Sequence, residues 1–357
     1  NSRLIKMKLV ASGIPANTFF NYGLYNKQND CIFLGSASKG FYFIRKNPLQ
    51  SKQPALFDIN EKNSFYSQVE LPDGNILTSS GAIIGNAAVP NDYNIRQGFL
   101  NSVFDIDDST LIYGSRDSIY NLNKKDYKKK LMFTTNINGS FSLCYSGSNL
   151  YFASQKGIGI IKNDTSFSFL KVFDEKSSIR LHPYGMIEIV PGKLAIATCD
   201  GLLQFDIRKK SIDTILRLPG ICIRSLHKEG EYIFIGTYGG GFYIMKDAVL
   251  KAMPMDINQY LKYAHCFIKD KKGFVWISTN NGLFKVKLAD IITAYEQDLV
   301  QIYYHYFGKD DGMETTEMNG GCEPCAIRLK NNIISFPTMD GLLWVNPENT
   351  DVVLPSG

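Results

Sequence analysis

Several features of common functional classes are missing from this sequence of 357 residues. No stretch reaches the eighteen or more consecutive apolar residues of a membrane-spanning helix, and residues 1–20 lack the pattern of a signal peptide. The net charge of +5 is modest, and the basic residues are scattered, with residues 128–130 the densest group. Scattered charge is typical of solvated turns, so we expect no nucleic-acid partner.

Motifs of catalytic and metal sites are also missing. The sequence has no G-x-S-x-G, no H-E-x-x-H and no sialidase-like box. Its glycine-rich YGGGF (238–242) lies in an expected β-turn, without the following helix of a phosphate cradle. No two of the four histidines have metal-ligand spacing: His182, His227, His265 and His305. We therefore expect a non-catalytic protein without metal or cofactor.

Carboxylates leave one catalytic alternative. A pair of them facing a pocket could make a glycosidase or a polysaccharide lyase. The densest acidic group is Asp310, Asp311, Glu314 and Glu317. The first two precede Gly312, where an ordinary turn accounts for them. We keep the enzyme as the weaker alternative.

The seven cysteines are odd in number and too sparse for a disulfide scaffold in a chain of this length. Four of them lie in apolar runs, where we expect free thiols buried as small hydrophobic groups: Cys31, Cys144, Cys222 and Cys266. Cys322 and Cys325 form a single C-x-x-C, which is weak support for zinc without a second pair or a nearby histidine. Structural roles are the expectation for all of them.

What the sequence does have is hydrophobic material and a repeat. Its hydrophobic share of 44% and aromatic share of 13% are enough for a large core. EYIFIGTYGGGFYIMK (231–246) and GFVWISTNNGLFKVK (273–287) share one frame: an apolar run, a small residue with Thr, a turn ending in Gly, and a second apolar run. Two-residue alternation and short apolar runs indicate strands rather than helices.

The same frame recurs along the chain at intervals of about 40 residues. Further copies lie at 31–46, 75–89, 110–124, 149–162, 193–206 and 332–347. The turn before the third strand falls near Gly40, Gly81, Asp117, Gly157, Gly201, Gly240, Gly282 and Gly341. This period predicts an all-β fold, a β-propeller of four-stranded blades. We count eight blades, or seven if the weak copy at 75–89 is not independent.

The two ends of the chain predict how the ring closes. The opening residues 4–20 resemble the link that precedes the last copy, so the chain begins with an outer strand and ends with three inner ones. The N-terminal strand would then complete the last blade and remove an open edge. We expect a single propeller domain over residues 1–357, with one helix at 289–299.

The repeats also resemble a known family. GFVWISTNNGLFKV, YIFIGTYGGGFYIM and the run from FGKDDGMETTEMNGG to DGLLWVNPEN are similar to the two-component regulator propeller repeat. The resemblance is sharp from about residue 220 to 349, whereas Ser79, Ser115 and Ser154 stand where the family has Thr. Of the two tryptophans, only Trp276 stands at the family's Trp position.

The resemblance implies a function and a place. Such repeats form the extracytoplasmic sensor region of hybrid two-component histidine kinases of the Bacteroides type, which sense glycan fragments. It implies a propeller excised from a larger membrane receptor, in the periplasm, without the kinase itself. Its partners would be an oligosaccharide and the neighbouring propeller and β-sandwich domains, and the full receptor could form a homodimer. A protein-interaction propeller without a small ligand is the alternative.

A ligand would sit on one face of such a ring. The turns between second and third strands and the links between blades open on the same face, around the central channel. Sugar recognition needs flat aromatic rings and planar amide, carboxylate or guanidinium groups. The candidate ligand-binding residues on this rim are Arg116, Tyr238, Asn280, Asn281, Asp340, Glu317 and Asn319. Asn and Asp are also what tight turns require, so each has a structural alternative.

Overall fold

The computed structural model describes residues 14–27, 30–45, 47–53, 63–85, 102–115, 118–134, 141–163, 166–173 and 181–350. The chain divides into two compact units. Unit 1 comprises Asn1–Pro48 and Glu348–Gly357, and unit 2 comprises Leu49–Pro347. This division reflects the contacts within each unit and does not test the expectation of one domain over residues 1–357, which stays a prediction.

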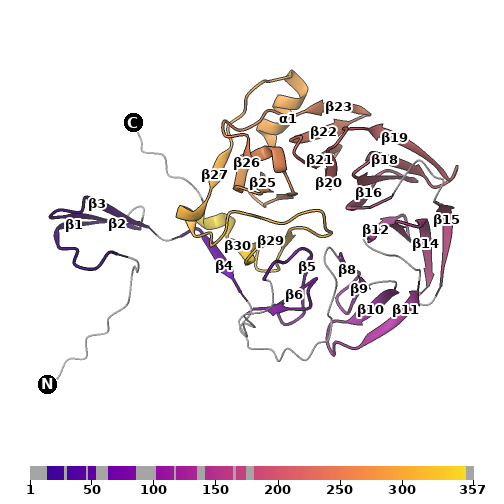
Figure 1. Ribbon diagram of the computed structural model, residues 1–357, viewed down its shortest axis with the longest axis horizontal. Coiled ribbons are helices and arrows are strands. Elements are labelled where there is room, and N and C mark those ends of the chain that lie inside the picture. Colours follow the sequence, from indigo (N-terminus) through magenta and orange to yellow (C-terminus); the bar gives the residue numbers. More distant parts are fainter. Residues whose placement is uncertain are drawn as a thin grey trace. The chain divides into compact units, whose positions relative to one another are not determined.

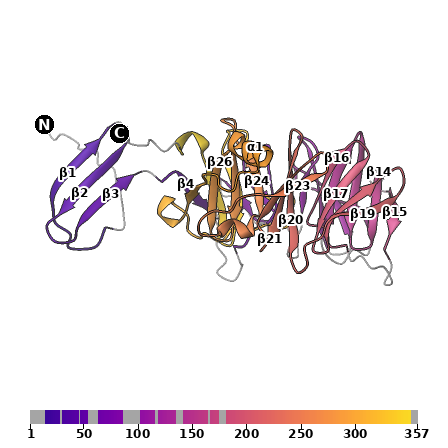
Figure 2. The ribbon, with the colours of Figure 1, turned by 90° about the horizontal axis from the view of Figure 1, so that it is seen from above.

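Unit 2 contains seven antiparallel sheets among its described residues, and they follow one another around a ring (Figure 1). Figure 2 shows the strands running across the thickness of this ring. In five sheets, four strands that are consecutive in sequence pair in order from the innermost outward. The first of these sheets is formed by β8 (Val103–Asp105), β9 (Thr110–Ser115), β10 (Ser118–Asn123) and β11 (Lys129–Thr134). The second is formed by β12 (Phe141–Ser146), β13 (Asn149–Ser154), β14 (Gly157–Asn163) and β15 (Ser166–Val172). The third is formed by β16 (Gly185–Val190), β17 (Lys193–Thr198), β18 (Gly201–Asp206) and β19 (Ser211–Leu216).

The next two sheets carry the sharpest copies of the repeat. They are formed by β20 (Cys222–Glu229), β21 (Tyr232–Tyr238), β22 (Phe242–Lys246) and β23 (Val249–Ala252), and by β24 (Cys266–Lys269), β25 (Phe274–Thr279), β26 (Gly282–Lys287) and β27 (His305–Phe307). A short 3-10 helix, Tyr260–Tyr263, lies between them. The expected helix is confirmed as α1 (Leu288–Gln297), inserted before β27. The described part of the weak copy, residues 75–85, contributes two strands to a sheet whose described strands are β5 (Gln68–Glu70), β6 (Ile76–Thr78) and β7 (Ile83–Ile84).

The seventh sheet joins the two ends of unit 2. Its inner strands are β28 (Ile327–Arg328), β29 (Ile334–Thr338) and β30 (Gly341–Val345), and its outer strand is β4 (Leu49–Lys52). β4 pairs with β30 in antiparallel register, with Leu49 opposite Val345. An N-terminal strand thus completes the last sheet, as expected. The strand is β4 rather than one from the opening residues 4–20, because β4 begins unit 2; residues 1–13 lie outside the described residues.

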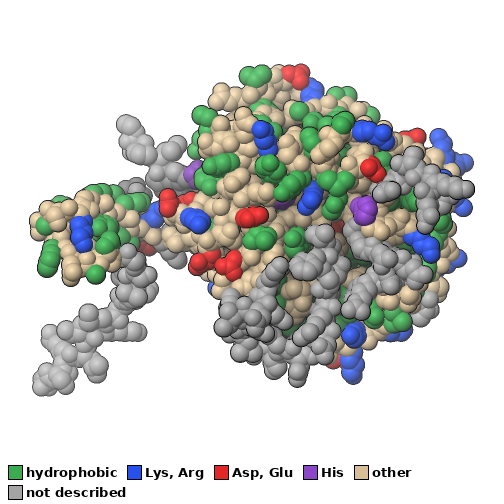
Figure 3. All heavy atoms as spheres, in the orientation of Figure 1, with side chains coloured by type: hydrophobic (Ala, Val, Ile, Leu, Met, Phe, Trp, Pro, Cys, Tyr) green, Lys and Arg blue, Asp and Glu red, His purple; other side chains and the backbone are tan. Residues whose placement is uncertain are grey.

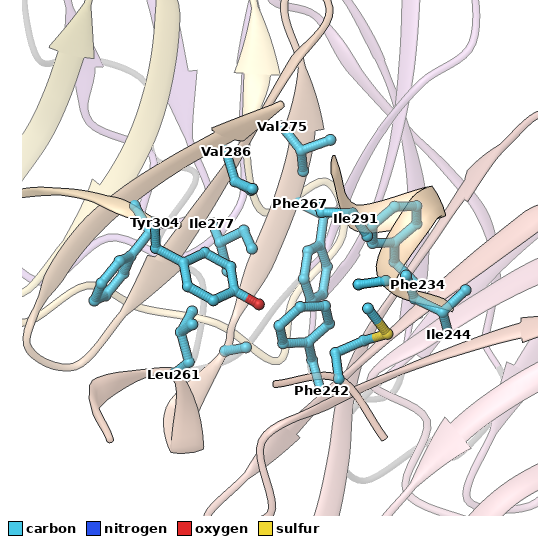
Figure 4. Packing of buried hydrophobic residues seen from close by; sticks show 14 of the residues in the cluster. Phe234, Phe242, Ile244, Leu261, Phe267, Val275, Ile277, Val286, Ile291 and Tyr304 are labelled. Atoms are coloured by element: carbon cyan, nitrogen blue, oxygen red, sulfur yellow. The ribbon is translucent and has the colours of Figure 1, made fainter. Parts of the chain in front are cut away.

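Side chains fill every interface between successive sheets of this ring. Seven clusters of buried hydrophobic residues each span two neighbouring sheets. Figure 4 shows one of them, in which Phe234 and Phe242 meet Phe267 and Ile277 of the following sheet. The last sheet packs on both the sixth and the first, so the order of contacts returns to its start. The all-β propeller predicted from the repeat is therefore confirmed.

The repeated Thr has a clear physical role. The hydroxyls of Thr198, Thr279 and Thr338 donate to the carbonyl oxygen at the end of the following turn, at 2.8, 2.9 and 2.9 Å. Ser154, which replaces Thr, makes the same bond at 3.1 Å. The turn glycine is required because its φ is positive, for example 123° at Gly282, where a Cβ would lie 2.6 Å from a backbone oxygen.

Unit 1 holds the eighth sheet. It pairs β1 (Phe20–Asn26), β2 (Cys31–Ser36) and β3 (Phe41–Arg45), and β2 and β3 come from the first copy of the repeat. The eight copies thus correspond to eight sheets among the described residues, of which seven lie in unit 2 and one lies in unit 1. The copy at 31–46 lies in unit 1, whereas the weak copy at 75–89 lies in unit 2. Large apolar side chains are exposed on this small sheet and directly before it, including Phe19 (75%), Tyr22 (67%) and Phe41 (65%).

The cysteines differ from expectation. Cys199 pairs with Cys222, and Cys266 pairs with Cys325, so Cys222 and Cys266 are not free thiols. The partners are distant in sequence and adjacent in the fold, which spacing along one chain does not reveal. The described free thiols are Cys31, Cys144 and Cys322. Within the described residues, no helix is both long and apolar enough to cross a bilayer.

The division into units predicts the outcome of truncation. A chain that starts at residue 47 keeps all seven sheets of unit 2 and should melt as a cooperative unit. A chain that starts at residue 54 lacks β4, and with it Leu49, whose side chain is 1% exposed. We expect it to lose about 2–4 kcal/mol of unfolding free energy and to aggregate through the open edge of β30. Equal melting temperatures and monomeric behaviour for both truncations would contradict the role of β4.

Candidate functional site

One link segment lies among the innermost strands of unit 2. We call residues 320–326, between the turn after Asn319 and β28, the channel segment. The backbone oxygen of Glu323 accepts from Ser67 Oγ (2.6 Å) and from Val103 N (3.0 Å). Its backbone nitrogen donates to Ser102 Oγ at 3.1 Å, and Cys325 is bonded to Cys266 of β24. The segment thus connects several sheets at the centre of the ring.

The side chain of Glu323 extends these connections. Its two carboxylate oxygens accept from Ser142 Oγ of β12 and, at 3.0 Å, from Met186 N of β16. Burial raises the pKa of this carboxyl to about 7, against the opposing effect of these two hydrogen bonds. Near neutral pH the group therefore divides between its neutral and charged forms.

Beside the channel segment, an arginine lies between two aromatic rings. The guanidinium carbon of Arg224 is 5.0 Å from the ring centre of Tyr184 and 4.6 Å from that of Tyr238. The ring of Tyr263 packs edge-on against Tyr238 at 5.0 Å. A Cβ on Gly321 would lie 3.0 Å from Arg224 Cδ, so the glycine lets the channel segment approach this group. We call Tyr184, Arg224, Tyr238 and Tyr263 the tyrosine–arginine cluster.

A buried histidine joins this cluster to the next turn. His265, which is 2% exposed, lies 6.0 Å from the Tyr238 ring, and its Nε2 is hydrogen-bonded to Asn280 Oδ1. An amide oxygen can only accept, so Nε2 carries the proton. Burial lowers the pKa of His265 to about 4, which keeps the ring neutral at physiological pH. A neutral histidine supports the neighbouring arginine without repelling it.

The structure brings two predicted site residues into this group. Tyr238 is 41% exposed at the end of β21, and Asn280 is half-buried in the β25–β26 turn; both contact His265. Among the described residues, the Asn280 amide nitrogen has no hydrogen-bond partner. Asn281 follows in the same turn, where its backbone oxygen accepts from Tyr306 Oη at 2.8 Å.

The other predicted residues have contacts outside the tyrosine–arginine cluster. Asp340 accepts from Gln53 Nε2 (3.0 Å) and Asn63 Nδ2 (3.1 Å), in the β29–β30 turn. Asn319 is buried, and its amide nitrogen donates to three oxygens, including Phe65 O at 2.7 Å, so it holds the link in place. Glu317 is exposed, and its backbone oxygen accepts from Met339 N. Arg116 lies outside the described residues. The binding roles of all these residues stay predictions.

Sequence reasoning missed Arg224, Tyr184, Tyr263 and Glu323. A signal existed for Arg224, which is the one charged residue in the apolar run ICIRSL of an expected inner strand. Glu323 gave no such signal, because its burial follows from where the link runs. No group of three or more His, Cys, Asp or Glu able to hold a metal occurs within the described ranges.

Lys and Arg side chains are spread over several sheets on the face of unit 2 in Figure 3. A separate hollow of about 410 Å³ lies between the sheets β8–β11 and β12–β15. Its polar lining includes Asn121, Asn149 and Lys162. It contains no member of the tyrosine–arginine cluster, so it is distinct from that site.

Comparison with solved structures identifies the fold. The chain is similar to the extracellular domain of a B. thetaiotaomicron protein assigned to the hybrid two-component systems, with a TM-score of 0.63 and 14% identity. The match covers 83% of this chain and 39% of that one, so this chain spans well under half of the other's length. The resemblance seen in the repeats is thus confirmed at the level of the fold.

Two further structures show how widely this fold is used. The WD40 propeller domain of Doa1 matches with a TM-score of 0.56 and 11% identity, over 84% of this chain and 98% of that one. Streptogramin B lyase, an enzyme, matches with a TM-score of 0.54 and 10% identity, over 84% of this chain and 97% of that one. The fold therefore does not decide between binding and catalysis. No protein-family model and no curated protein matches the sequence.

Proposed function

We propose that this chain is part of an extracytoplasmic, non-catalytic sensor of a hybrid two-component system, and that it recognises glycan-derived oligosaccharides for signalling to a kinase. The observation that carries the proposal is the tyrosine–arginine cluster on the channel face. Tyr238 offers a half-exposed ring, and Asn280 offers an amide nitrogen without a partner among the described residues. Rings and planar polar groups are what sugar recognition uses.

The fold and the cysteines support the location. The similar B. thetaiotaomicron structure is an extracellular domain. Disulfides persist in oxidising compartments, and this chain has two, Cys199–Cys222 and Cys266–Cys325. A periplasmic sensor region of an inner-membrane receptor fits both observations.

Unit 1 supports the proposed domain partners. Its three-stranded sheet follows the same repeat as the sheets of unit 2, yet Phe19, Tyr22 and Phe41 are more than half exposed. Exposed apolar side chains of this number mark a surface that another part of a protein covers. We propose that a neighbouring propeller covers it, with a β-sandwich as the further neighbour and a homodimer in the full receptor.

A binding experiment on the full sensor region tests the proposal. Calorimetry across a panel of oligosaccharides should show one class binding with modest affinity, because sugar hydroxyls exchange water hydrogen bonds for protein ones. Tyr238→Ala should weaken that binding roughly fivefold, since a stacked ring contributes about 1 kcal/mol. Tyr303→Ala is the matched control, because Tyr303 is 74% exposed and lies outside the cluster.

Two outcomes would contradict the proposal. One is a sensor region that binds no oligosaccharide of the panel. The other is hydrolysis or elimination of a polysaccharide by the chain, which would establish the enzyme instead.

A further inference from the structure

The charge of Arg224 has no counter-ion in direct contact among the residues that the structure describes. Among the described residues, its guanidinium makes no hydrogen bond and no ion pair; its contacts are the rings of Tyr184 and Tyr238. Its Nε is buried and has no acceptor within the described part of the chain. A desolvated donor on a cation without an acceptor is costly, so the folded protein gains free energy when an acceptor is supplied.

Glu323, the acidic group on the channel segment, does not supply it. Both its carboxylate oxygens already accept hydrogen bonds, from Ser142 and Met186. No ion pair joins it to Arg224 among the described residues. The neutral ring of His265 next to Tyr238 adds no negative charge either.

The backbone of β20 forms a β-bulge at Arg224. Ile223 lies opposite Thr237 and Ser225 opposite Gly236, so Arg224 is the extra residue of a β-bulge. Bulges turn a side chain away from the regular alternation of a strand, and they occur often beside binding sites. Here the guanidinium carbon lies 5.0 Å from the ring centre of Tyr184 and 4.6 Å from that of Tyr238, and the side chain lies beside Gly321.

We propose that Arg224 is an oxyanion-binding position of the channel face, which takes a carboxylate or a sulfate group of an acidic sugar. A planar guanidinium binds either group through two parallel hydrogen bonds. The tyrosine rings hold the cation by cation–π contact, which uses none of its N–H donors. This proposal rests on the proposed recognition of oligosaccharides and narrows the ligand to a charged one.

Three sugars that differ only at carbon 6 test it: glucose, glucuronate and glucose 6-sulfate, with sodium acetate and sodium sulfate as the smallest probes. Calorimetry on the whole chain should show that at least one charged probe binds about tenfold or more tightly than glucose, and that salt weakens this binding. Binding of glucuronate would indicate a carboxylate ligand, and binding of glucose 6-sulfate would indicate a sulfate ligand.

Variants then assign the site. Arg224→Gln should reduce binding of the charged probe at least about tenfold. Arg224→Lys keeps the charge and should recover part of it, and serves if the glutamine variant does not fold. Arg208→Gln, which removes an exposed charge from the turn after β18, should leave binding unchanged.

The proposal is overturned if no charged probe binds more tightly than glucose, or if Arg224→Gln binds it as tightly as the natural chain. Oligosaccharide recognition itself fails separately, when the full sensor region binds no member of a panel that includes neutral and charged glycans. A neutral glycan that binds equally well to the Arg224→Gln variant would reject this inference and keep the proposed function.

Discussion

Replacing Trp276 by alanine should lower the free energy of unfolding by about 3–5 kcal/mol, which is the usual cost of removing a fully buried large side chain. The ring is 0% exposed and lies in the cluster between the sheet β24–β27 and the last sheet, stacked on Phe307 at 5.4 Å. Its Nε1 donates to Asp270 Oδ2 at 2.9 Å. Denaturant unfolding followed by circular dichroism measures the loss.

A matched pair of variants separates packing from hydrogen bonding at this site. Trp276→Phe keeps an aromatic ring but leaves an oxygen of Asp270, which is 2% exposed, without its donor. Trp344 is also buried, but its Nε1 has no hydrogen-bond partner among the described residues. Trp276→Phe should therefore cost about 1–3 kcal/mol more than Trp344→Phe. Equal losses would mean that the bond to Asp270 adds nothing to stability.

Glu323→Gln should stabilise the protein at pH 8 by about 2–3 kcal/mol and change little at pH 4.5. The folded-state pKa of Glu323 is raised to about 7 by burial, so the folded protein binds this proton more tightly than the unfolded chain does. Stability contributed by this group is therefore present below pH 4.5 and is lost as pH rises through 7. Glutamine can still accept from Met186 and donate to Ser142, without the charge.

Unfolding free energies measured between pH 4.5 and 8 test this prediction. The natural chain should lose stability across this range more steeply than the variant. Glu314→Gln serves as the control, because Glu314 is exposed on the same link and should leave the slope unchanged. Parallel pH profiles for the natural chain and Glu323→Gln would show that the carboxyl titrates normally.

The sequence allowed the fold to be predicted because the turn chemistry repeats. All copies except the one at 110–124 carry a hydroxyl residue followed three or four residues later by a glycine. The structure shows why: the hydroxyl closes the turn and the glycine adopts a positive φ, as at Thr279 and Gly282. These are local requirements, which one copy satisfies by itself. Membership of a ring is not local, because it depends on which strands pair and pack. For this reason the sequence does not predict that the sheet formed by the copy at 31–46 falls in unit 1.

The site was predictable only in part, for the same reason. The turn positions placed Tyr238 and Asn280 on one face, and the structure joins them through His265. The roles of Arg224 and Glu323 depend on their three-dimensional surroundings. Arg224 lies at a β-bulge, and Glu323 lies on a link that crosses the inner strands. Neither environment can be read from alternation along a single strand.

The pairing of β4 with β30 has a consequence for how the protein is made. During synthesis β4 emerges before any other strand of unit 2, whereas β30 emerges last. The intervening sheets can form one by one from neighbouring strands, but β4 must wait unpaired until almost the whole unit has left the ribosome. The inner strands that contact Glu323 must also wait for their partner, because Glu323 belongs to the last link and is synthesised late. For most of its synthesis the nascent chain therefore has β4 unpaired and the channel segment missing from the centre of the ring. Pairing of β4 with β30 closes the ring and ends this exposure to aggregation.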